Sequence, residues 1–505
     1  MIKSREMKIL LVNPPYKIDM GNGYERFFVR AGSRWPFSMV KRKGSRPRNY
    51  VPFPFFMAYA AAVLRDGGMQ PQVLDGVAMD VSIGAFLRRC AEQKPDMVAY
   101  ETSTPTIAYD LEIARRLKEE LACHIVMTGP HATVLGREIL ANNPQVDSVL
   151  LGEYEQSLFL LAKKLAGGGE PVPGFMERVD GQIVETAQAG PIELDSLPMP
   201  AWDMFPANGE MNIGAYWDNM LQYRPGVQLH ASRGCPYRCN FCLFNQVMYK
   251  EGKYRVFSPT RVVDELELTK NKYGARAAYF DDDSFTISRK HVLGICDEIT
   301  RRGLDVKWSC MGDAMAVTDD MIGRMADAGC IGMKFGIESG DPALLRAMGK
   351  PLDLDRALAV AGKCARHGIK THATFTFGIQ GETAQSLQKT LEYARRLDVD
   401  TVQFSVTIPF PGTRYFDSMF AEGRIISADW RDYDGSSNCL VRFDNLGADE
   451  VERFSRSFGG KWLGARLSHP WWVLRQFRYM GRTLMGQGSG GVIRLGANAL
   501  ESLWR

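Results

Sequence analysis

The chain has 505 residues, an apolar fraction of 45% and a formal net charge of +4, from 62 basic and 58 acidic residues. This length exceeds what one hydrophobic core supports, so we expect two or three domains. The nearly balanced charge does not indicate a nucleic acid partner, and ten cysteines are too dilute over this length for a secreted disulfide scaffold.

The beginning of the chain and its apolar runs predict neither a signal peptide nor a membrane span. Only four apolar residues separate the basic start from Asn13 and its two prolines, which is too few for a signal sequence. The longest apolar run, residues 51–64, contains two prolines and is shorter than a bilayer-spanning helix. We therefore expect a protein of the reducing cytoplasm.

Strands and helices are expected to alternate over the first part of the chain. Short apolar runs with the length of buried parallel strands occupy residues 8–12, 72–75, 96–100, 124–128 and 146–151. Helical patterns at 55–65, up to about residue 92, and at 111–121 lie between them. Residues 16–50, rich in glycine, arginine and aromatics, are expected to form a long loop. This alternation predicts a doubly wound parallel sheet.

Four loops at the carboxyl ends of these strands form a candidate ligand site. Ligands of doubly wound sheets bind at this edge. Glycine there permits a close approach of the backbone, and hydroxyl groups supply hydrogen bonds. The loops are residues 13–16, 101–106, 129–133 and 152–155. After them, residues 166–225 are dense in glycine and proline and are predicted to be a linker.

Cys235, Cys239 and Cys242 stand in C-x3-C-x2-C spacing on one short loop. Three thiolates can hold three irons of a [4Fe-4S] cluster, and the fourth iron is then open for chemistry. The alternative is a structural zinc site with His230 as the fourth ligand. No second cysteine pair follows at zinc-finger spacing, which favours the cluster. The other seven cysteines are scattered and are expected to be small buried hydrophobes.

Strand–helix alternation resumes around and after the cysteine loop. Six predicted strands occupy residues 227–231, 277–280, 306–309, 331–337, 370–377 and 402–408. Polar residues follow several of them, including Asp282, Asp283 and Glu338, and the turn 378–383. Such strand ends are where barrel enzymes gather their functional groups.

The cysteine spacing, with Phe241 before the last cysteine, resembles the signature of the radical S-adenosylmethionine (SAM) enzymes. In that family the open iron chelates SAM, and an electron from the cluster breaks a carbon–sulfur bond to leave a 5'-deoxyadenosyl radical. The six β/α units are similar to the family's partial barrel. The resemblance implies that Asp282 and Asp283 hold the SAM ammonium group and that Glu338 hydrogen-bonds the ribose or amino acid part. The residues expected near adenine are Gly378, Gly381 and Glu382.

The four loops of the first domain resemble the cobalamin-binding domain that precedes many radical SAM enzymes. This implies that the nucleotide tail of cobalamin packs around the loops, with contacts from Ser103, Thr104, Gly129, His131, Gly152 and Glu153. The D-x-H-x-x-G motif is absent after the first strand, so the resemblance implies a cobalt without a histidine ligand. His131 is expected to be a hydrogen-bonding wall residue. The alternative is a vestigial flavodoxin-like domain that binds no cofactor.

The region after residue 430 matches no motif of the family, but residues 471–485 have a readable helical pattern. Val473, Phe477, Met480 and Leu484 share one face, and three arginines share the opposite face. A basic amphipathic helix of this kind, with Trp471 and Trp472 beside it, is a candidate for peripheral membrane contact. The alternative is a helix that packs on the barrel with solvated arginines.

These observations together predict an α/β protein in four segments. They are a cobalamin-binding Rossmann-like domain (1–165), a linker (166–225), a partial (β/α)6 radical SAM barrel (226–430) and a mostly helical C-terminal substrate or capping region (431–505).

The function implied by the resemblance is C-methylation of an unactivated carbon through a 5'-deoxyadenosyl radical and methylcobalamin. The cofactors would be a [4Fe-4S] cluster, SAM and cobalamin. The expected partners are a small-molecule, candidate lipophilic substrate and an electron donor such as flavodoxin or ferredoxin. The alternatives are an oxidative cyclase or rearrangement enzyme of the Mg-protoporphyrin ester cyclase type, and a non-catalytic cobalamin or cluster sensor.

Overall fold

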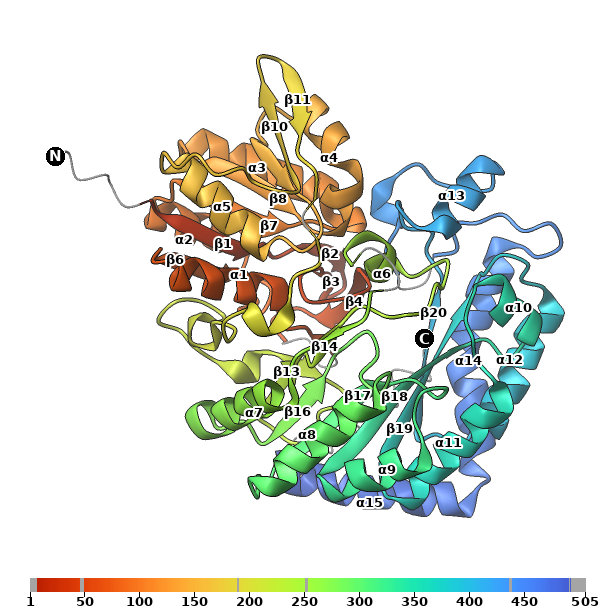
Figure 1. The fold of residues 1–505 in the computed structure, drawn as a ribbon. Coiled ribbons are helices and arrows are strands. Elements are labelled where there is room, and N and C mark those ends of the chain that lie inside the picture. Colours follow the sequence, from red (N-terminus) through yellow and green to blue (C-terminus); the bar gives the residue numbers. More distant parts are fainter. Residues whose placement is uncertain are drawn as a thin grey trace.

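A computed structural model describes residues 7–45, 50–188, 190–249, 253–435, 438–489 and 491. Two large sheets organise this part of the chain (Figure 1). The first has seven strands in the order β11-β10-β9-β8-β7-β1-β6, and the second has six in the order β13-β16-β17-β18-β19-β20. The predicted α/β fold with two successive sheet units is confirmed.

The first sheet has a parallel core of five strands covered by helices. All five predicted strands are present, as β1 Ile9–Asn13, β6 Pro71–Asp75, β7 Met97–Glu101, β8 His124–Thr128 and β9 Ser148–Leu150. The helices are α1 Phe55–Asp66, α2 Ile83–Gln93, α3 Ile107–Glu120, α4 Pro130–Asn142 and α5 Glu155–Leu165. Residues of β1 alternate between two hydrophobic cores, Ile9 and Leu11 in one and Leu10 and Val12 in the other. Because the strand is buried on both faces, all of its core positions are apolar, which explains the continuous apolar run in the sequence.

The prediction of a long loop at residues 16–50 is wrong. This segment forms a three-stranded antiparallel sheet of β2 Lys17–Gly21, β3 Tyr24–Val29 and β4 Phe37–Arg42, followed by the short strand β5 Tyr50–Val51. Asn22 and Gly23 join β2 to β3 with positive φ angles of 50° and 80°. An Asn-Gly pair between alternating apolar residues is a strong hairpin signal, and the glycine-rich composition concealed it.

The predicted linker contains regular structure. Strands β10 Phe175–Val179 and β11 Gln182–Glu185 form a hairpin that extends the first sheet from β9. Further along, the rings of Trp202, Phe205 and Tyr216 surround Phe53, with Trp202 stacked on it at 4.1 Å between centroids. Strand β12 Trp217–Asp218 pairs with β5. The segment therefore packs between the two sheets, and the boundaries at 165 and 225 stay a prediction.

The second sheet consists of the six predicted parallel strands. Their bounds are β13 Gly226–Leu229, β16 Ala277–Phe280, β17 Lys307–Gly312, β18 Cys330–Glu338, β19 Lys370–Phe377 and β20 Thr401–Val406. The helices between them are α7 Pro259–Tyr273, α8 Arg289–Arg301, α9 Asp319–Asp327, α10 Pro342–Ala347, α11 Leu354–Arg366 and α12 Ala384–Arg396. One hydrophobic core runs from Ile9 in β1 to Val406 in β20, so both sheets share it.

The C-terminal helices pack on the barrel. Helix α14 Ala448–Leu467 covers the outer face of the last strands, where Phe458 contacts the rings of Phe375 and Phe404. Helix α15 Pro470–Gln487 lies across the end of the sheet at which the strands begin (Figure 1). None of the described helices is long and apolar enough to cross a membrane.

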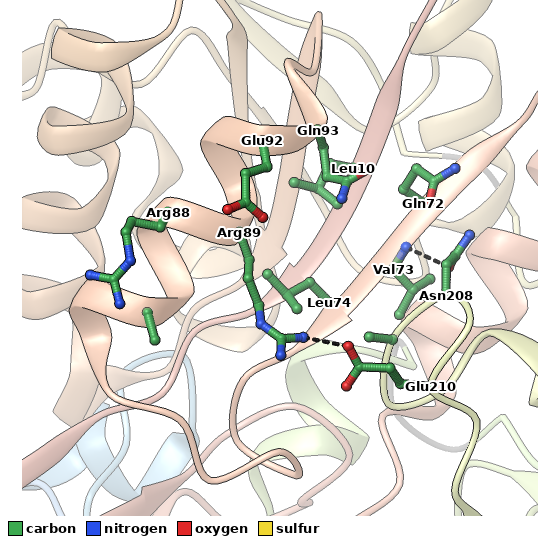
Figure 2. Close-up of a pocket in the computed structure, with 12 residues that line it drawn as sticks. Leu10, Gln72, Val73, Leu74, Arg88, Arg89, Glu92, Gln93, Asn208 and Glu210 are labelled. Atoms are coloured by element: carbon green, nitrogen blue, oxygen red, sulfur yellow. Dashed lines mark hydrogen bonds and ion pairs between the residues drawn. The ribbon is translucent and has the colours of Figure 1, made fainter.

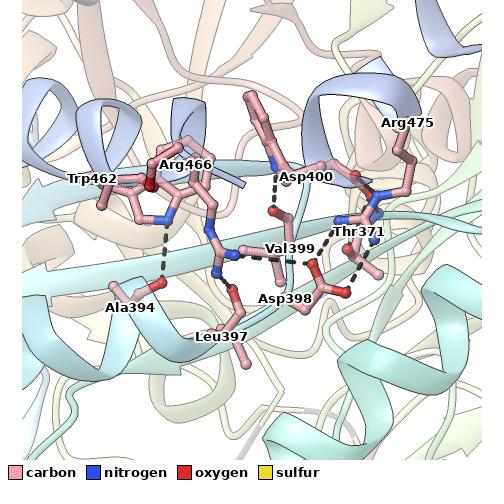
Figure 3. A network of polar contacts seen from close by, with 12 residues as sticks. Thr371, Ala394, Leu397, Asp398, Val399, Asp400, Trp462, Arg466 and Arg475 are labelled. Carbon is pink, nitrogen blue, oxygen red and sulfur yellow. Dashed lines mark hydrogen bonds and ion pairs between the residues drawn. The ribbon is translucent and has the colours of Figure 1, made fainter. Parts of the chain in front are cut away.

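Helix α15 docks through buried Trp472 and Tyr479 and through two arginines, while most of its predicted apolar face points away from the barrel. Arg475 donates to both carboxylates that precede β20, with Nε 2.6 Å from Asp400 Oδ1 and Nη2 2.8 Å from Asp398 Oδ1 (Figure 3). Arg482 donates to the carbonyl of Gly368 at 2.9 Å. The expectation of solvated arginines is therefore wrong for these two residues. The Asp400 side chain is fully buried, and a buried carboxylate is stable only with a cation and hydrogen bonds beside it.

The opposite side of α15 is an exposed apolar ridge. It consists of Trp471, Leu474, Phe477, Met480, Leu484 and Met485, with exposures from 39% to 83%. A helical wheel shows only that the two faces differ, and the acidic residues before β20 decide which face is inward.

Arg475→Met should lower the free energy of unfolding by about 2 kcal/mol, because it leaves buried Asp400 without its cation while other donors remain. Denaturant titration measures this loss. Arg478→Met, at an exposed arginine of the same helix, is the control and should change stability by less than about 0.5 kcal/mol. Equal losses in the two variants would show that the Arg475 ion pairs contribute nothing.

Candidate active site

The three cysteines lie on a loop that follows β13 at the carboxyl end of the barrel strands. Two amides of the short helix α6 Leu243–Val247 hold this loop in shape. Gln246 Nε2 donates to the carbonyls of Cys239, Asn240 and Cys242 at 3.3, 3.0 and 2.9 Å. Asn245 donates to the carbonyl of Tyr237 at 2.7 Å. Because one side chain bridges the carbonyls of two cysteines, it fixes the path of the loop between them.

Gly234 permits the turn that leads into Cys235. Its φ is +83°, and a Cβ there would lie 1.9 Å from the carbonyl oxygen of Lys253. Any other residue would displace the neighbouring chain. The backbone therefore fixes the position of the first cysteine.

The three loop cysteines are more exposed than the other cysteines of the chain. All ten cysteines are free, and only Cys235, Cys239 and Cys242 are partly exposed. Within the described residues, no three His, Cys, Asp or Glu side chains converge to hold a single ion. His230, the proposed fourth zinc ligand, is instead stacked on Phe55 at 3.6 Å.

Burial raises the pKa of all three loop cysteines, that of Cys235 to about 12. As free groups they are therefore thiols, and an iron centre would deprotonate them when it binds. The ammonium group of Lys350 lies close enough to Cys235 and Cys239 to lower their pKa in part.

Asp282 and Asp283, predicted to hold the SAM ammonium group, anchor the start of the cysteine loop. Asp282 Oδ1 accepts from the backbone N–H groups of Ala231 and Ser232 at 2.8 and 3.1 Å, and Asp283 Oδ2 accepts from Gly234 at 3.0 Å. Burial raises the pKa of Asp282 to about 8. Its Oδ2 is buried and has no hydrogen-bond partner among the described residues. That oxygen is free to accept a bond from a ligand, so the SAM contact stays a prediction.

Glu338 ends β18 in an unusual conformation. Its φ is +67°, and the pairing with β19 shifts between Gly336 and Glu338. The Glu338 carboxylate folds back over Gly336, so that a Cβ added to Gly336 would lie 2.5 Å from Glu338 Oε1. Lys350 Nζ lies 3.4 Å from the same oxygen. Positive φ is uncommon for a residue other than glycine, and here it directs the Glu338 side chain back along the strand. This geometry supports a role for Glu338, and its predicted SAM contact is untested.

The turn predicted to lie near adenine is rigid. Gly378 and Gly381 have φ of +76° and +85°, and Tyr415 donates to the carbonyl of Gly378 at 2.6 Å. Glu382 is buried and accepts from Ser386, and burial raises its pKa to about 7. Glu382 therefore holds the turn together from within.

Phe241, beside the last cysteine, contacts the N-terminal half of the chain. Its ring stacks on Trp35, with centroids 5.8 Å apart, in the segment between β3 and β4. The neighbouring Arg34 donates to Asp281 Oδ1 at 2.8 Å and to the carbonyl of Asp282 at 2.6 Å. The small antiparallel sheet therefore extends to the mouth of the barrel.

The predicted cobalamin loops come together at the carboxyl edge of the first sheet. Ser103 Oγ lies 3.0 Å from Thr106 Oγ1, and His131 Nδ1 lies 3.1 Å from Thr104 Oγ1. Burial lowers the pKa of His131 to about 4, so its ring is neutral. These contacts agree with a hydrogen-bonding wall residue. That His131 does not ligate the cobalt stays a prediction.

Two features of this edge fit a buried, polar ligand tail. Gly129 has φ of +92°, and a Cβ there would lie 2.9 Å from the carbonyl of Thr102. The hydroxyl of Thr128, at the end of β8, is buried without a partner among the described residues. A buried hydroxyl without a hydrogen-bond partner, close to a glycine that lets a ligand approach the backbone, fits a bound nucleotide tail. Gly152 donates its N–H to Thr133 Oγ1 at 3.0 Å.

Glu153, predicted as a cobalamin contact, joins the two sheet units. Arg233, two residues before Cys235, places its Nη1 2.9 Å from Glu153 Oε1 and 2.7 Å from Glu155 Oε1. Arg255 Nη2 lies 2.8 Å from the other oxygen of Glu153. The Arg233 side chain is completely buried between the rings of Phe56 and Tyr59. A cobalamin contact of Glu153 stays a prediction.

Sequence reasoning missed Arg233, Lys350 and Trp35 as site residues. Arg233 adjoins the cysteine motif, so its position was a usable signal. Lys350 follows Cys242 by 108 residues, and Trp35 precedes Phe241 by 206 residues. Only the fold brings them to the loop.

A groove on the described surface lies away from these loops (Figure 2). It has a volume of about 480 Å³ and lies between edge strand β6 and helix α2, where Arg89 pairs with Glu210 at 2.8 Å. No residue of the cysteine loop or of the four cobalamin loops lines it. We do not assign it to the active site.

Comparison with known protein families identifies both units. Residues 229–394 match the radical SAM superfamily, and residues 48–161 match the B12 binding domain. The first match contains the three cysteines, and the second contains the four loops except for residues 13–16. The cofactors of these domains are the [4Fe-4S] cluster with SAM, and cobalamin.

Relatives are similar to this chain over most of its length. An uncharacterized methyltransferase, PH0819 of Pyrococcus horikoshii, is 28% identical over 80% of this chain and 86% of its own length. The anaerobic magnesium-protoporphyrin IX monomethyl ester cyclase of Rubrivivax gelatinosus is 27% identical over 73% of this chain and 66% of its own length. The solved structure of the radical SAM methyltransferase TsrM from Kitasatospora setae, with cobalamin and a [4Fe-4S] cluster, superposes with a TM-score of 0.66. It is 17% identical and covers 91% of this chain and 89% of its own.

Replacing Cys235, Cys239 or Cys242 with alanine should abolish the brown [4Fe-4S] absorbance of the reconstituted protein, because each supplies one iron ligand. Iron content and the visible spectrum measure this. Cys310→Ala and Cys439→Ala, at buried cysteines outside the loop, are controls that should keep full iron content. Iron that survives the loss of any loop cysteine would show that the cluster is held elsewhere.

Proposed function

We propose that this chain, a radical SAM enzyme with an N-terminal B12-binding domain, transfers a methyl group to an unactivated carbon of a small molecule. The observation that carries the proposal is the direct contact between the two cofactor loops. Arg233 of the cysteine loop is ion-paired with Glu153 and Glu155, which follow β9 of the B12-binding domain. A substrate at this junction is within reach of both cofactors.

The bound cofactors would supply a strong one-electron reductant that cleaves SAM and a transferable methyl group. The chain's own residues position them. Cys235, Cys239 and Cys242 would hold the cluster, and Asp282 and Asp283 fix the backbone that carries Cys235. We assign Glu338 and its partner Lys350 to the amino acid part of SAM, because a carboxylate and an ammonium group 3.4 Å apart complement its charged groups.

A radical cyclase is the alternative function. The relative from Rubrivivax gelatinosus carries that activity in its name, and it aligns with 73% of this chain. The methyltransferase assignment has wider support, from a relative that aligns over 86% of its own length and from the fold of a methyltransferase. A non-catalytic sensor is disfavoured, because the strained Glu338 and the rigid Gly378–Glu382 turn are retained.

A small electron carrier, such as flavodoxin or ferredoxin, is the proposed reducing partner. Arg238 lies within the cysteine loop and is exposed, and exposed Arg414 donates to its carbonyl at 2.6 Å. A basic surface beside the cluster complements an acidic carrier. The ten free cysteines support a reducing, cytoplasmic location.

We also propose peripheral membrane contact through residues 471–485. The helix would lie on the membrane in an orientation that differs from the one predicted from the sequence. The exposed ridge of Trp471, Leu474 and Phe477 would enter the lipid interface, while Arg475 and Arg482 face the barrel. Helix α15 contains no acidic residue. Such contact would suit an acceptor with an apolar body.

Anaerobic turnover with deuterated-methyl SAM tests the methyl transfer. We expect a product that carries one deuterated methyl group, formed together with 5'-deoxyadenosine, as mass spectrometry detects. The Cys239→Ala variant should form neither compound. A product that has lost hydrogen and gained no deuterium would favour the cyclase.

Substituting Trp471 and Phe477 with serine should weaken co-sedimentation with lipid vesicles about tenfold or more, because each buried ring contributes about 2 kcal/mol. Phe420→Ser is the control, since Phe420 is 68% exposed but lies on α13 Arg414–Ala421. Salt should change this binding little, because Arg475 and Arg482 are turned inward. Full-length protein that stays in the supernatant at low salt would exclude the contact.

A further inference from the structure

Strands β18, β19 and β20 present an unusually polar face to the inside of the barrel. Met333, Phe335 and Ile337 are buried on the helix-covered side of β18, and Ala373 and Phe375 are buried on the same side of β19. The alternate residues Lys334 and Gly336, and His372 and Thr374, are partly exposed. Gln403 of β20 is exposed, although helix α14 covers the other face of that strand. Side chains alternate along a strand, so these polar residues share the inner face.

The register brings the polar residues together. Lys334 of β18 is the partner of His372 in β19, and His372 is the partner of Thr401 in β20. Lys334 Nζ lies 3.4 Å from Gln403 Oε1, and His372 Nδ1 lies 2.8 Å from Thr401 Oγ1. We call Lys334, Lys370, His372, Thr374 and Gln403 the inner basic face.

The cations of this face lack a close counterion. No ion pair within 4.0 Å joins Lys334 or Lys370 to any carboxylate of the described chain. The acidic groups that influence them are Asp218, Asp400 and Glu338, and each has another partner. Met220 N–H donates to Asp218, Arg475 pairs with Asp400, and Lys350 pairs with Glu338. Burial and the two lysines keep His372 neutral by lowering its pKa, and burial also lowers the pKa of Lys370.

An ammonium group inside a protein is stable when it has a counterion. Here the amide of Gln403 lies beside Lys334 on a face that solvent reaches. A cation with a neighbouring hydrogen-bonding group can bind a carboxylate or a phosphate.

The face lies on the strand that ends at the cofactor site. Lys334 precedes Glu338 by four residues on β18, a separation of about 13 Å along an extended strand. A ligand held at Lys334 can therefore extend to the cysteine loop if its reacting carbon is about 10 Å from its anionic end. This is the length of a small organic molecule.

We propose that the inner basic face binds an anionic group of the methyl acceptor, with Lys334 as the main contact. The acceptor is accordingly an organic carboxylate or phosphate whose reacting carbon points toward the carboxyl ends of the strands. This identification of the substrate class rests on the proposed methyl transfer. The anion site itself is independent of it.

Direct binding tests the site without turnover. Acetate and inorganic phosphate, as separate probes, are titrated into cluster-loaded protein and followed by proton saturation-transfer and phosphorus NMR. We expect saturable binding of at least one probe, weakened tenfold or more in Lys334→Met, and the preferred probe indicates which anion is recognised. Lys307→Met, at an exposed lysine that begins neighbouring strand β17 and pairs with Asp305, is the matched control and should bind normally. Intact cluster absorbance shows that each variant is folded, and Lys334→Arg should restore part of the binding.

Turnover then tests the substrate class. A metabolite extract is separated on an anion exchanger, and each fraction is incubated with the enzyme and deuterated-methyl SAM. Labelled product from salt-eluted fractions, with KM raised at least tenfold in Lys334→Met and 5'-deoxyadenosine formation retained, supports the proposal. An acceptor in the uncharged flow-through, or probe binding that is absent or unchanged in Lys334→Met, overturns it. A third outcome separates the two proposals. If Lys334→Met loses probe binding but the wild-type enzyme labels no fraction, the anion site is supported and methyl transfer is rejected.

Discussion

The buried Arg233 side chain is the constraint on which the rest of this structure depends. It is a barrel residue two positions from the first cluster cysteine, and it is fully enclosed by Phe56, Tyr59, Glu153 and Glu155 of the B12-binding domain. A charge buried this completely is tolerated only with its partners in place, and removing one partner of such a pair costs about 3–5 kcal/mol. The relative position of the two domains is therefore fixed at the cysteine loop itself.

Several other contacts converge on the same loop from distant parts of the chain. Asp282 and Asp283 hold its entrance from β16, and Trp35 covers Phe241 from the small antiparallel sheet. Gln246 gathers its carbonyls from within. An open-coordinated cluster requires ligands that do not move, and this loop is supported on every side by polar groups that the chain supplies.

The two ends of the barrel have different tasks. At the carboxyl ends, strained Glu338 and the glycine turn at 378–381 present polar groups to the cofactor site. At the opposite end, Arg475 of α15 neutralises the acidic start of β20 and closes the sheet. Between them the inner face of β18–β20 keeps the cations of Lys334 and Lys370 without close counterions. The ion pairs of α15 stabilise the end at which the strands begin. The groups available for ligand binding lie at the centre of the barrel and at the carboxyl ends of the strands.

The sequence alone determined what depends on neighbours along the chain. The strand and helix periodicities predicted both sheets, and the spacing of Cys235, Cys239 and Cys242 predicted a cluster loop, because a short loop must bring its own residues together. The hairpin at Asn22-Gly23 was equally local and was overlooked in a glycine-rich segment. The tertiary structure decided which face of α15 turns inward, that Glu153 meets Arg233, and that Lys350 and Trp35 reach the loop. Those outcomes depend on charges and rings placed by other elements, and no local pattern contains their positions.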